Sequence, residues 1–558
     1  MVRKMLGMVY REVRGLHQAA YVLALFAIGS QLLALVRDRL LAHQFGAGAE
    51  LDMYYAAFRI PDLLFVLFAS TLSVYVLIPF VSKTTDDGVK RGSELLSQVF
   101  TIFLAFYSAV AVGLYFAMPQ LSLWLFPGIE DQTMLVLLSR LLLLQPFLLG
   151  ISSLFGVVTQ IGHRFVLYAV SPIVYNIGII VGIAGLYPFI GLPGLAVGVV
   201  FGAWLHLMVQ WPFVRQSEYR LGLAAFFDLK KLSEILALSI PRALTLSMQQ
   251  IVMLALFGFA SAMAVGSVSV FQFAYNLFSV PLAIIGVSYS VAAFPVMSEL
   301  WGKGKRDEFN LHIVTALRHI IFWAVPAIVL IIVLRAQLVR VVLGSGAFDW
   351  SDTRLTAAVL AVLMVSLLAH AVSLVAVRAF YAGGRTLVPF MVTAFGSVLA
   401  LAFSYVSYLI YMADERLAGY VSSVMRLGGV EGSEVLALAF GYAFAVILQS
   451  IVLVGLLVVD FRVPLLSSWR SLGRAVPAAL VGGLFAYVAL NFTVEGVEQE
   501  RLIGILIQGF LAGAAGIFGS AMTYTWSRSP ELQEIYSSFQ KKILKTDVVA
   551  PQEEVLGN

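Results

Sequence analysis

The chain has 558 residues, of which 60% are hydrophobic and only 12% are charged, and its formal net charge is +5. Soluble domains carry about 25% charged residues, so this composition excludes an ordinary soluble protein and indicates an integral membrane protein. The chain has no cysteine, which excludes disulfides, thiolate nucleophiles and thiolate metal sites. Its seven histidines are scattered without the spacing of a metal-binding motif, so a metalloenzyme is not expected.

Apolar runs long enough to span a bilayer recur along the whole chain. They lie at 18–41, 53–82, 95–118, 134–157, 165–186, 193–214, 235–262, 268–297, 312–334, 355–380, 387–412, 435–459, 474–492 and 502–526. The sequence therefore predicts an all-α integral membrane protein with about 14 transmembrane helices.

The basic residues predict the topology. If the N-terminus is cytoplasmic, the cytoplasmic loops hold 25 of the 36 lysines and arginines, and the outer loops hold six. This asymmetry follows the positive-inside rule, so we expect both termini to be cytoplasmic. The basic N-terminus leads into an apolar run that is too long for a cleavable signal peptide, so none is expected.

A weak internal repeat predicts two halves. Pro79-Phe-Val-Ser82 ends the second run and Pro295-Val-Met-Ser298 ends the eighth, while similar glycine-containing turns follow the fourth and tenth runs. Parallel repeats of this kind are found in two-lobed transporters. We expect an N-terminal lobe of six helices at 1–214 and a C-terminal lobe of six at 234–460. An amphipathic cytoplasmic linker at 215–233 would join them, followed by two helices at 461–526 and a cytoplasmic tail at 527–558.

Charged residues concentrate between Leu35 and Asp62. Ionisable groups are costly at membrane depth and usually face a bundle interior or a wet cavity, although long side chains near a helix end can instead reach the headgroups. Asp52, Tyr55, Arg59 and Asp62 have the spacing of one helical face. We therefore expect this stretch to line a functional site.

Further polar residues lie at span depth. The guanidiniums of Arg37, Arg59 and Arg242, if they face one cavity, would suit a phosphate-bearing substrate. Gln272 and Asn276 are four residues apart in the eighth run. Three aspartates would either neutralise the arginines or carry a coupling proton: Asp38, Asp52 and Asp62. Other amides are expected to join helices by hydrogen bonds: Gln145, Asn176, Gln249 and Gln250.

Several motifs resemble those of the MurJ/MviN family, the lipid II flippases of the multidrug/oligosaccharidyl-lipid/polysaccharide exporter superfamily. They are Arg37-Asp38, Phe45-Gly46-Ala47, Asp52-Met-Tyr-Tyr-Ala-Ala-Phe-Arg-Ile-Pro-Asp62, Gly162-His-Arg-Phe165, Tyr275-Asn-Leu277 and Arg378-Ala-Phe-Tyr-Ala382. The resemblance implies two lobes in a V-shaped bundle plus two C-terminal helices, in the inner (cytoplasmic) membrane of a bacterial cell.

The resemblance also implies a function. A flippase of this family would move lipid II, a polyprenyl-diphosphate sugar, from the inner to the outer leaflet by alternating access. The expected substrate-binding residues are Arg37, Asp38, Asp52, Arg59, Arg242 and Asn276, and those considered for coupling are Asp38, Asp52 and Asp62. No cofactor or metal site is expected. Coupling to membrane potential, H+ or Na+ would drive transport, since no ATPase is present. The chain has no Walker A motif and no large aqueous domain, so a transporter is expected rather than an enzyme.

Some charged positions of the family are changed in this chain. Gln31, Phe65, Val66 and Asn276 stand where the family has arginine, and Ser70-Thr71 replaces an acidic residue and glycine. Two alternatives to lipid II transport therefore remain open. One is export of another lipid-linked glycan or an amphipathic small molecule, and the other is a transport-inactive membrane scaffold for cell-envelope enzymes. The expected partners are a lipid-linked glycan, membrane lipids and cell-wall synthesis enzymes, and no nucleic acid.

Overall fold

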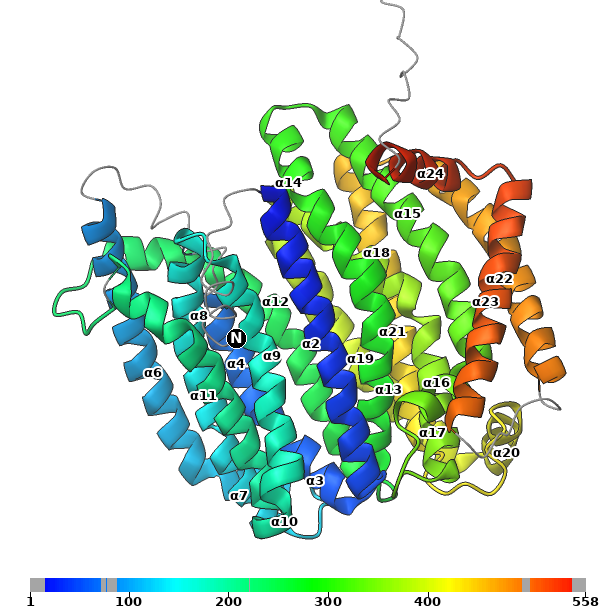
Figure 1. Cartoon of the computed structure of the whole chain (residues 1–558), viewed down its shortest axis with the longest axis horizontal. Coiled ribbons are helices and arrows are strands. Elements are labelled where there is room, and N and C mark those ends of the chain that lie inside the picture. Colours follow the sequence, from blue (N-terminus) through cyan, green and yellow to red (C-terminus); the bar gives the residue numbers. More distant parts are fainter. Residues whose placement is uncertain (1–15, 72–76, 78–87, 220, 494–501, 544–558) are drawn as a thin grey trace, which may run out of the picture. The chain divides into compact units, whose positions relative to one another are not determined.

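The computed structural model describes residues 16–71, 77, 88–219, 221–493 and 502–543, and the elements in these ranges are helices (Figure 1). In the first half of the chain they are α2 (Leu16–Phe45), α3 (Ala49–Ala57), α4 (Arg59–Thr71), α6 (Gly88–Leu125), α7 (Gln132–Leu142), α8 (Leu144–Ile161), α9 (Phe165–Val181), the π-helical η1 (Gly182–Leu186), α10 (Tyr187–Ile190), α11 (Leu192–Gln216), α12 (Leu229–Ser261) and α13 (Ser267–Pro281).

The second half continues in the same way. Its elements are the π-helical η2 (Leu282–Val287), α14 (Ser288–Gly302), α15 (Arg306–Val333), α16 (Arg335–Val342), α17 (Trp350–Val365), α18 (Leu367–Ala382), α19 (Leu387–Ala413), α20 (Glu415–Val424), α21 (Val435–Phe461), α22 (Leu466–Thr493), α23 (Leu502–Trp526) and α24 (Pro530–Ile543). The predicted all-α membrane fold is confirmed.

Eleven of the described helices are long and apolar enough to cross a membrane, and the bent pair α17 and α18 makes a twelfth span if it counts as one. The expected run at 18–41 falls on α2, and the run at 53–82 begins on α3 and α4. These helices hold the charged stretch, and the second run extends into residues outside the described ranges. The expected number of fourteen spans stays a prediction.

The chain divides into two compact units. The first consists of Met1–Val280, Val339–Leu363 and Arg385–Gln449, and the second of Pro281–Leu338, Met364–Gly384 and Ser450–Asn558. The lobe boundaries expected from the sequence, the linker and tail assignments, and the V-shaped arrangement remain predictions.

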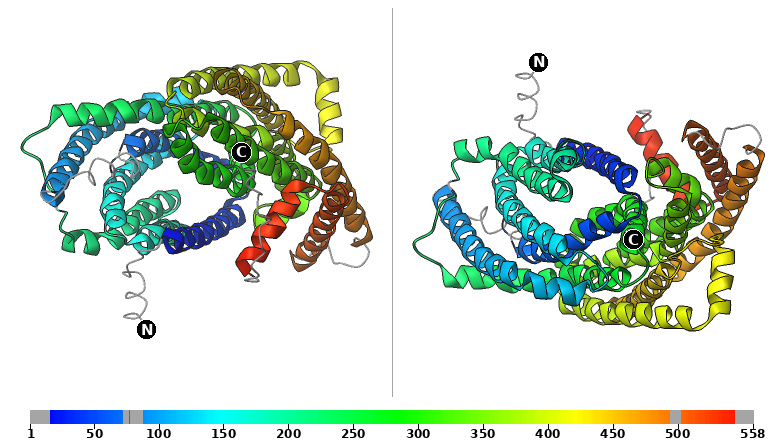
Figure 2. Two further views of the ribbon diagram at one scale, coloured as in Figure 1. Left: turned by 90° about the horizontal axis from the view of Figure 1, so that it is seen from above. Right: turned by 90° about the horizontal axis from the view of Figure 1, so that it is seen from below.

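In the first unit, α9 and the η1 turn that continues it at Gly182 pack on α11 through glycines, and α9 and α11 lie side by side when seen from above and below (Figure 2). A Cβ atom added to Gly178 would lie 2.2 Å from the Cα of Gly202, and one added to Gly198 would lie 2.3 Å from the Cα of Gly182. Small residues four positions apart let membrane helices approach until their backbones touch. These two helices therefore form a closely packed wall of the first unit.

A cluster of aromatic side chains joins α4, α6 and α8 in the same unit. The rings of Phe68, Phe103, Tyr107 and Phe147 lie with centroids 5.2 to 6.3 Å apart, and the Tyr107 hydroxyl donates to the Leu143 carbonyl at 2.5 Å. Burial of the four rings stabilises the packing of these helices, and the hydrogen bond satisfies the buried hydroxyl of Tyr107.

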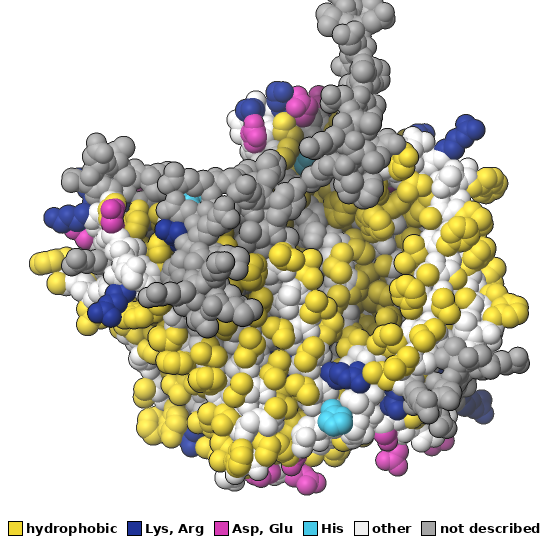
Figure 3. All heavy atoms as spheres, viewed as in Figure 1, with side chains coloured by type: hydrophobic (Ala, Val, Ile, Leu, Met, Phe, Trp, Pro, Cys, Tyr) yellow, Lys and Arg dark blue, Asp and Glu magenta, His cyan; other side chains and the backbone are white. Residues whose placement is uncertain are grey.

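The outward faces of the helices are apolar. On the face of the first unit visible in Figure 3, hydrophobic side chains cover the lengths of the helices, and charged side chains lie toward the helix ends. On α6, for example, Phe106 is 61% exposed and Trp124 is 79% exposed. Such a surface suits contact with hydrocarbon rather than water.

In the second unit, a buried carboxylate attaches α24 to α15 and α22. Glu531 accepts hydrogen bonds from Arg318 at 2.8 Å, Ser471 at 2.6 Å and Ser529 at 2.7 Å. Burial alone would raise the pKa of Glu531, but the hydrogen bonds from the two serines and the arginine outweigh burial and lower this pKa to about 2. α24 is thus held by a carboxylate that stays ionised at neutral pH.

Candidate functional site

The charged stretch is divided between two helices because the helix breaks at Phe58. Pro61 falls in the first turn of α4, where a missing N–H is tolerated, whereas in one continuous helix its ring would meet the carbonyl of Ala57. The N–H of Asp62 bonds to the carbonyl of Phe58 at 2.8 Å as α4 begins. Across this junction Tyr55, Arg59 and Asp62 still line one cavity, as the expected face implies, whereas Asp52 is bonded to Gly266 and Ser269 instead.

Asp52 binds the N-terminus of α13. Its Oδ2 accepts from the backbone N–H of Gly266 at 2.7 Å, and its Oδ1 accepts from the N–H of Ser269 at 2.7 Å and from the Ser269 hydroxyl. A carboxylate at this position satisfies unpaired N–H groups and interacts favourably with the helix dipole. Asp52 is 7% exposed and is engaged in holding α3 against α13.

Arg37, Arg59 and Asp62 of the stretch line a small polar cavity in the first unit, with a volume of about 180 Å³. Residues of α2, α3, α4, α8, α9 and α13, together with Phe58, surround it. They are Arg37, Leu41, Tyr54, Tyr55, Phe58, Arg59, Asp62, Gln145, Tyr175, Ile179, Gln272 and Asn276. Three of the expected substrate-binding residues, Arg37, Arg59 and Asn276, therefore come together, as does Asp62.

Arg37 belongs to a network that links α2 to α9 and α13. Its Nε and Nη2 donate to Oδ1 of Asp38 at 2.9 and 2.7 Å, and its Nη1 donates to the Asn176 side chain at 3.3 Å. Asn276 donates to the other oxygen of Asp38 at 2.9 Å, and Gln272 donates to Asn276. The guanidinium of Arg37 thus already has a carboxylate partner, and that carboxylate is buried and bonded on both oxygens.

Arg59 also lines the cavity and has a looser set of partners. Its Nη2 donates to Gln272 at 3.1 Å and lies 3.9 Å from Asp62, and its guanidinium carbon lies 4.1 Å from the centre of the Phe257 ring. The last contact has the geometry of a cation–π interaction. The side chain of Asp62 is 29% exposed, so its carboxylate is the more accessible of the two that face the arginines.

The other polar residues singled out in the sequence have different surroundings. The side chain of Arg242 lies outside the described residues, so its predicted part in the site stays a prediction. Gln249 donates to the hydroxyls of Tyr442 and Tyr275, and Asn176 donates to Ser30 and to the Pro172 carbonyl. These amides join helices, as expected.

The sequence model of the family described as "Lipid II flippase MurJ" matches residues 41–500. The chain belongs to the lipid II flippase MurJ family.

Relatives and solved structures of this family are similar along most of the chain. The lipid II flippase MurJ of Burkholderia cenocepacia is 24% identical over 518 residues, which are 90% of this chain and 96% of that protein. The probable lipid II flippase MurJ of Rhizobium tropici is 26% identical over 419 residues, which are 71% of this chain and 77% of that protein.

The fold likeness extends to the wider superfamily. A structure titled "Lipid II flippase MurJ, inward closed conformation" has a TM-score of 0.71 at 20% identity and covers 90% of this chain and 99% of that chain. An inward-facing multidrug resistance MATE transporter of the MOP superfamily has a TM-score of 0.62 at 16% identity and covers 78% of this chain and 94% of that chain.

Within the family, the changed arginine positions have distinct locations. Asn276 lines the cavity and bonds to Asp38, so an amide replaces a cation beside Arg37. Gln31 is exposed, and Phe65 and Val66 are half-buried in α4. The side chains of Ser70 and Thr71 lie outside the described residues. The cavity wall thus carries two guanidiniums where the family pattern would add a third.

Two lining residues, Tyr54 and Tyr175, were missed in the sequence because aromatic residues in apolar runs are typical of a packed core. Gln145, expected only to join helices, donates to the Tyr175 hydroxyl at 3.1 Å and also lines the cavity. The Tyr55 hydroxyl and the Gln145 Oε1 are buried without a hydrogen-bond partner in the described part of the chain. Among those same residues, no group of three or more His, Asp or Glu side chains could hold a metal ion.

Proposed function

We propose that this chain moves lipid II, a polyprenyl-diphosphate-linked sugar, across the membrane. The observation that supports this proposal most directly is the convergence of Arg37 and Arg59 on one polar cavity in a chain of this family. A guanidinium offers planar paired donors that match phosphate oxygens. Two of them on different helices could contact the two phosphates of a diphosphate.

Substrate binding would proceed by exchange of partners. In the present arrangement Asp38 is paired with Arg37, and Asp62 lies near Arg59. Each carboxylate therefore lies where a phosphate would bind its arginine. A diphosphate would replace them, and the buried Tyr55 hydroxyl would gain an acceptor. Because ligand cavities commonly measure about 300 to 1,000 Å³, the cavity must widen before it holds a sugar-bearing headgroup. Alternating access supplies such a change.

We also propose that Asp62 is the coupling residue among the three aspartates considered. Asp52 is bonded to the N-terminus of α13, and Asp38 is bonded on both oxygens. Asp62 faces the cavity, is partly exposed, and has its arginine 3.9 Å away. A proton or a sodium ion bound there would weaken its contacts with Arg59 and Gln145 and leave the bonds of Asp38 and Asp52 in place.

The test is complementation in a bacterium depleted of its own lipid II flippase. The unaltered chain should restore growth, whereas Arg37→Ala and Arg59→Ala should not. Arg140→Ala is the matched control, because Arg140 also lies within a spanning helix but bonds to the Tyr115 carbonyl and ring, away from the cavity. Failure of the unaltered chain to rescue growth, with normal amounts in the membrane, would contradict the proposal.

A second candidate is transport of another lipid-linked glycan or an amphipathic small molecule. The balance of two arginines and two aspartates around the cavity favours it, because a neutral wall binds a diphosphate less strongly than a cationic one. Mass spectrometry of lipids that co-purify with the chain distinguishes the two. If both arginine variants match the unaltered chain in complementation, the scaffold hypothesis gains instead.

The remaining expectations are proposals of the same kind. We place the chain in the bacterial inner membrane with both termini cytoplasmic, without enzymatic activity of its own, and beside cell-wall synthesis enzymes. The positive-inside asymmetry supports the orientation. Fusions of a cytoplasm-active and a periplasm-active reporter to each terminus test it.

A further inference from the structure

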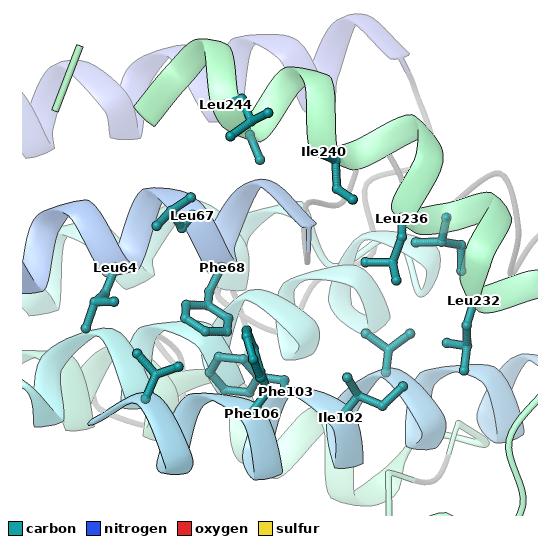
Figure 4. Close-up of a pocket in the computed structure, with 14 residues that line it drawn as sticks. Leu64, Leu67, Phe68, Ile102, Phe103, Phe106, Leu232, Leu236, Ile240 and Leu244 are labelled. Atoms are coloured by element: carbon teal, nitrogen blue, oxygen red, sulfur yellow. The ribbon is translucent and has the colours of Figure 1, made fainter. Parts of the chain in front are cut away.

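A second, apolar cavity lies in the first unit between α4, α6 and α12 (Figure 4). Its volume is about 500 Å³. The side chains that converge on it carry no polar atoms: Leu64, Leu67, Phe68, Val99, Ile102, Phe103, Phe106, Val110, Leu232, Ile235, Leu236, Ile240, Ala243 and Leu244. The proposed transport mechanism does not use this cavity.

The cavity reaches from the buried interior to the outer surface of the helices. Phe103 and Ile235 on its inner side are 3% exposed, whereas Phe106 and Ile240 on its outer side are 61% and 47% exposed. An apolar cavity of about 150 Å³ already stays dry, and an unfilled one destabilises a protein in proportion to its volume. A hydrocarbon chain from the bilayer is therefore the occupant that fits its size, lining and position.

The segment between α11 and α12 marks one end of the cavity as a membrane interface. Its backbone N–H groups at Ala224 and Asp228 donate to Thr101 and Gln98 of α6 at 2.8 and 3.0 Å, one turn or less from Ile102 in the lining. Leu223 and Phe226 in the same segment and Leu229 at the start of α12 are exposed by 77%, 87% and 76%. Apolar side chains followed by lysines are typical of segments that lie in the headgroup region.

Charges of both signs stand on α12 beside this segment. Lys230, Lys231 and Glu234 are exposed and, being three and four residues apart, are neighbours on the helix surface. Lys231 also precedes Ile235 of the lining by one turn. Asp228 already caps α12 through the N–H of Lys231 and lies 3.5 Å from its ammonium. This mixed cluster matches a headgroup that carries both a phosphate and a primary ammonium.

We propose that the cavity between α4, α6 and α12 binds one acyl chain of phosphatidylethanolamine. Its phosphate would contact Lys230 and Lys231, and its ammonium would contact Glu234. A lipid in this position would connect α12 with α4, and the first turn of α4 carries Arg59. A bound lipid would therefore stabilise α4, which forms one wall of the polar cavity, whichever substrate the chain transports.

The test uses the delipidated full-length protein and native mass spectrometry with phosphatidylethanolamine, phosphatidylglycerol and phosphatidylcholine of identical acyl chains. Phosphatidylethanolamine should be retained most strongly. Leu236→Trp, at a lining position that is 45% exposed and so tolerates a larger side chain, should weaken its retention at least tenfold, as should Ala243→Trp from inside the cavity.

The headgroup contacts are tested separately. Lys230→Gln with Lys231→Gln should weaken binding of phosphatidylethanolamine and phosphatidylglycerol alike, by about fivefold per lysine, which corresponds to roughly 1 kcal/mol each. Glu234→Gln should weaken phosphatidylethanolamine alone. The matched controls are Lys303→Gln with Lys305→Gln, at exposed ion-paired lysines of the second unit, and Gly113→Trp, at an open position of α6.

Three outcomes would overturn the proposal. They are equal retention of the three lipids, undiminished retention by a Leu236→Trp protein with an unchanged melting temperature, and recovery of a polyprenyl lipid in place of the phospholipid. None of them depends on whether the chain complements a missing flippase.

Discussion

The contacts of Asp52 predict a structural role that can be tested through stability, because both of its carboxylate oxygens are bonded at the start of α13. Asp52→Ala removes the acceptor for the N–H groups of Gly266 and Ser269 and for the Ser269 hydroxyl. A buried donor left without a partner costs about 1 to 3 kcal/mol. With two backbone donors affected, we expect a loss of about 3 to 5 kcal/mol in the free energy of unfolding.

Two further variants make this expectation specific. Asp52→Asn keeps an acceptor oxygen but loses the charge that interacts with the helix N-terminus, so about 1 to 2 kcal/mol should be lost. Asp414→Ala is the matched control, since Asp414 caps α20 in the same way, accepting from Arg416 and Leu417, but at an exposed position. An ordinary cap of this kind contributes about 1 kcal/mol.

The assay is denaturation of the purified protein in mixed detergent micelles, followed by tryptophan fluorescence. The unaltered chain should be the most stable and Asp52→Ala the least stable. Asp414→Ala and Asp52→Asn should lie between them, with similar free energies of unfolding. Equal losses in the free energy of unfolding for Asp52→Ala and Asp414→Ala would refute the argument that a buried cap stabilises the chain more than an exposed one.

Three other predictions follow from the contacts described. Asn276→Arg should add a third guanidinium opposite Asp38 and tighten binding of lipid II by about tenfold or more, measured by native mass spectrometry; unchanged affinity would contradict the exchange of partners. Glu531 has a folded pKa near 2, below its unfolded value of 4.5, so its stabilising effect is complete above pH 4.5 and is lost as the pH falls through 2. Melting temperatures of the unaltered chain should therefore drop over this range, whereas Glu531→Gln should be less stable at pH 7 by about 2 to 3 kcal/mol and show a smaller drop. Gly198→Leu should destabilise the chain by about 3 kcal/mol or more, while Gly113→Leu, which meets open space, should change little; similar melting temperatures for the two would show that the helix pair is not tightly packed.

The sequence predicted the helical membrane fold and most of the charged lining of the polar cavity. Arg37, Arg59 and Asp62 were recognisable because ionisable residues at membrane depth are rare and costly. Asn276 was recognisable because it shares a helical face with Gln272. These inferences use only local spacing and transfer energies, which are visible in a single chain.

The partners of these residues could not be predicted in the same way. Asp52 shares a sequence face with Arg59 but does not line the cavity, and its partners Gly266 and Ser269 lie more than two hundred residues away. Tyr175 carries no local signal, since a tyrosine in an apolar run looks like a core residue. Helix breaks and long-range pairing depend on the packed fold, so sequence spacing alone does not determine them.

The glycines between α9 and α11 also restrict how the sequence can change. Every substitution of glycine adds atoms, and at Gly178, Gly182, Gly198 and Gly202 the added atoms would meet the backbone of the opposite helix. No single mutation can therefore improve this contact, and a change on one helix cannot be compensated by a smaller residue on the other. The pair should vary least among members of the family, even where the lining of the cavity differs to suit a different cargo.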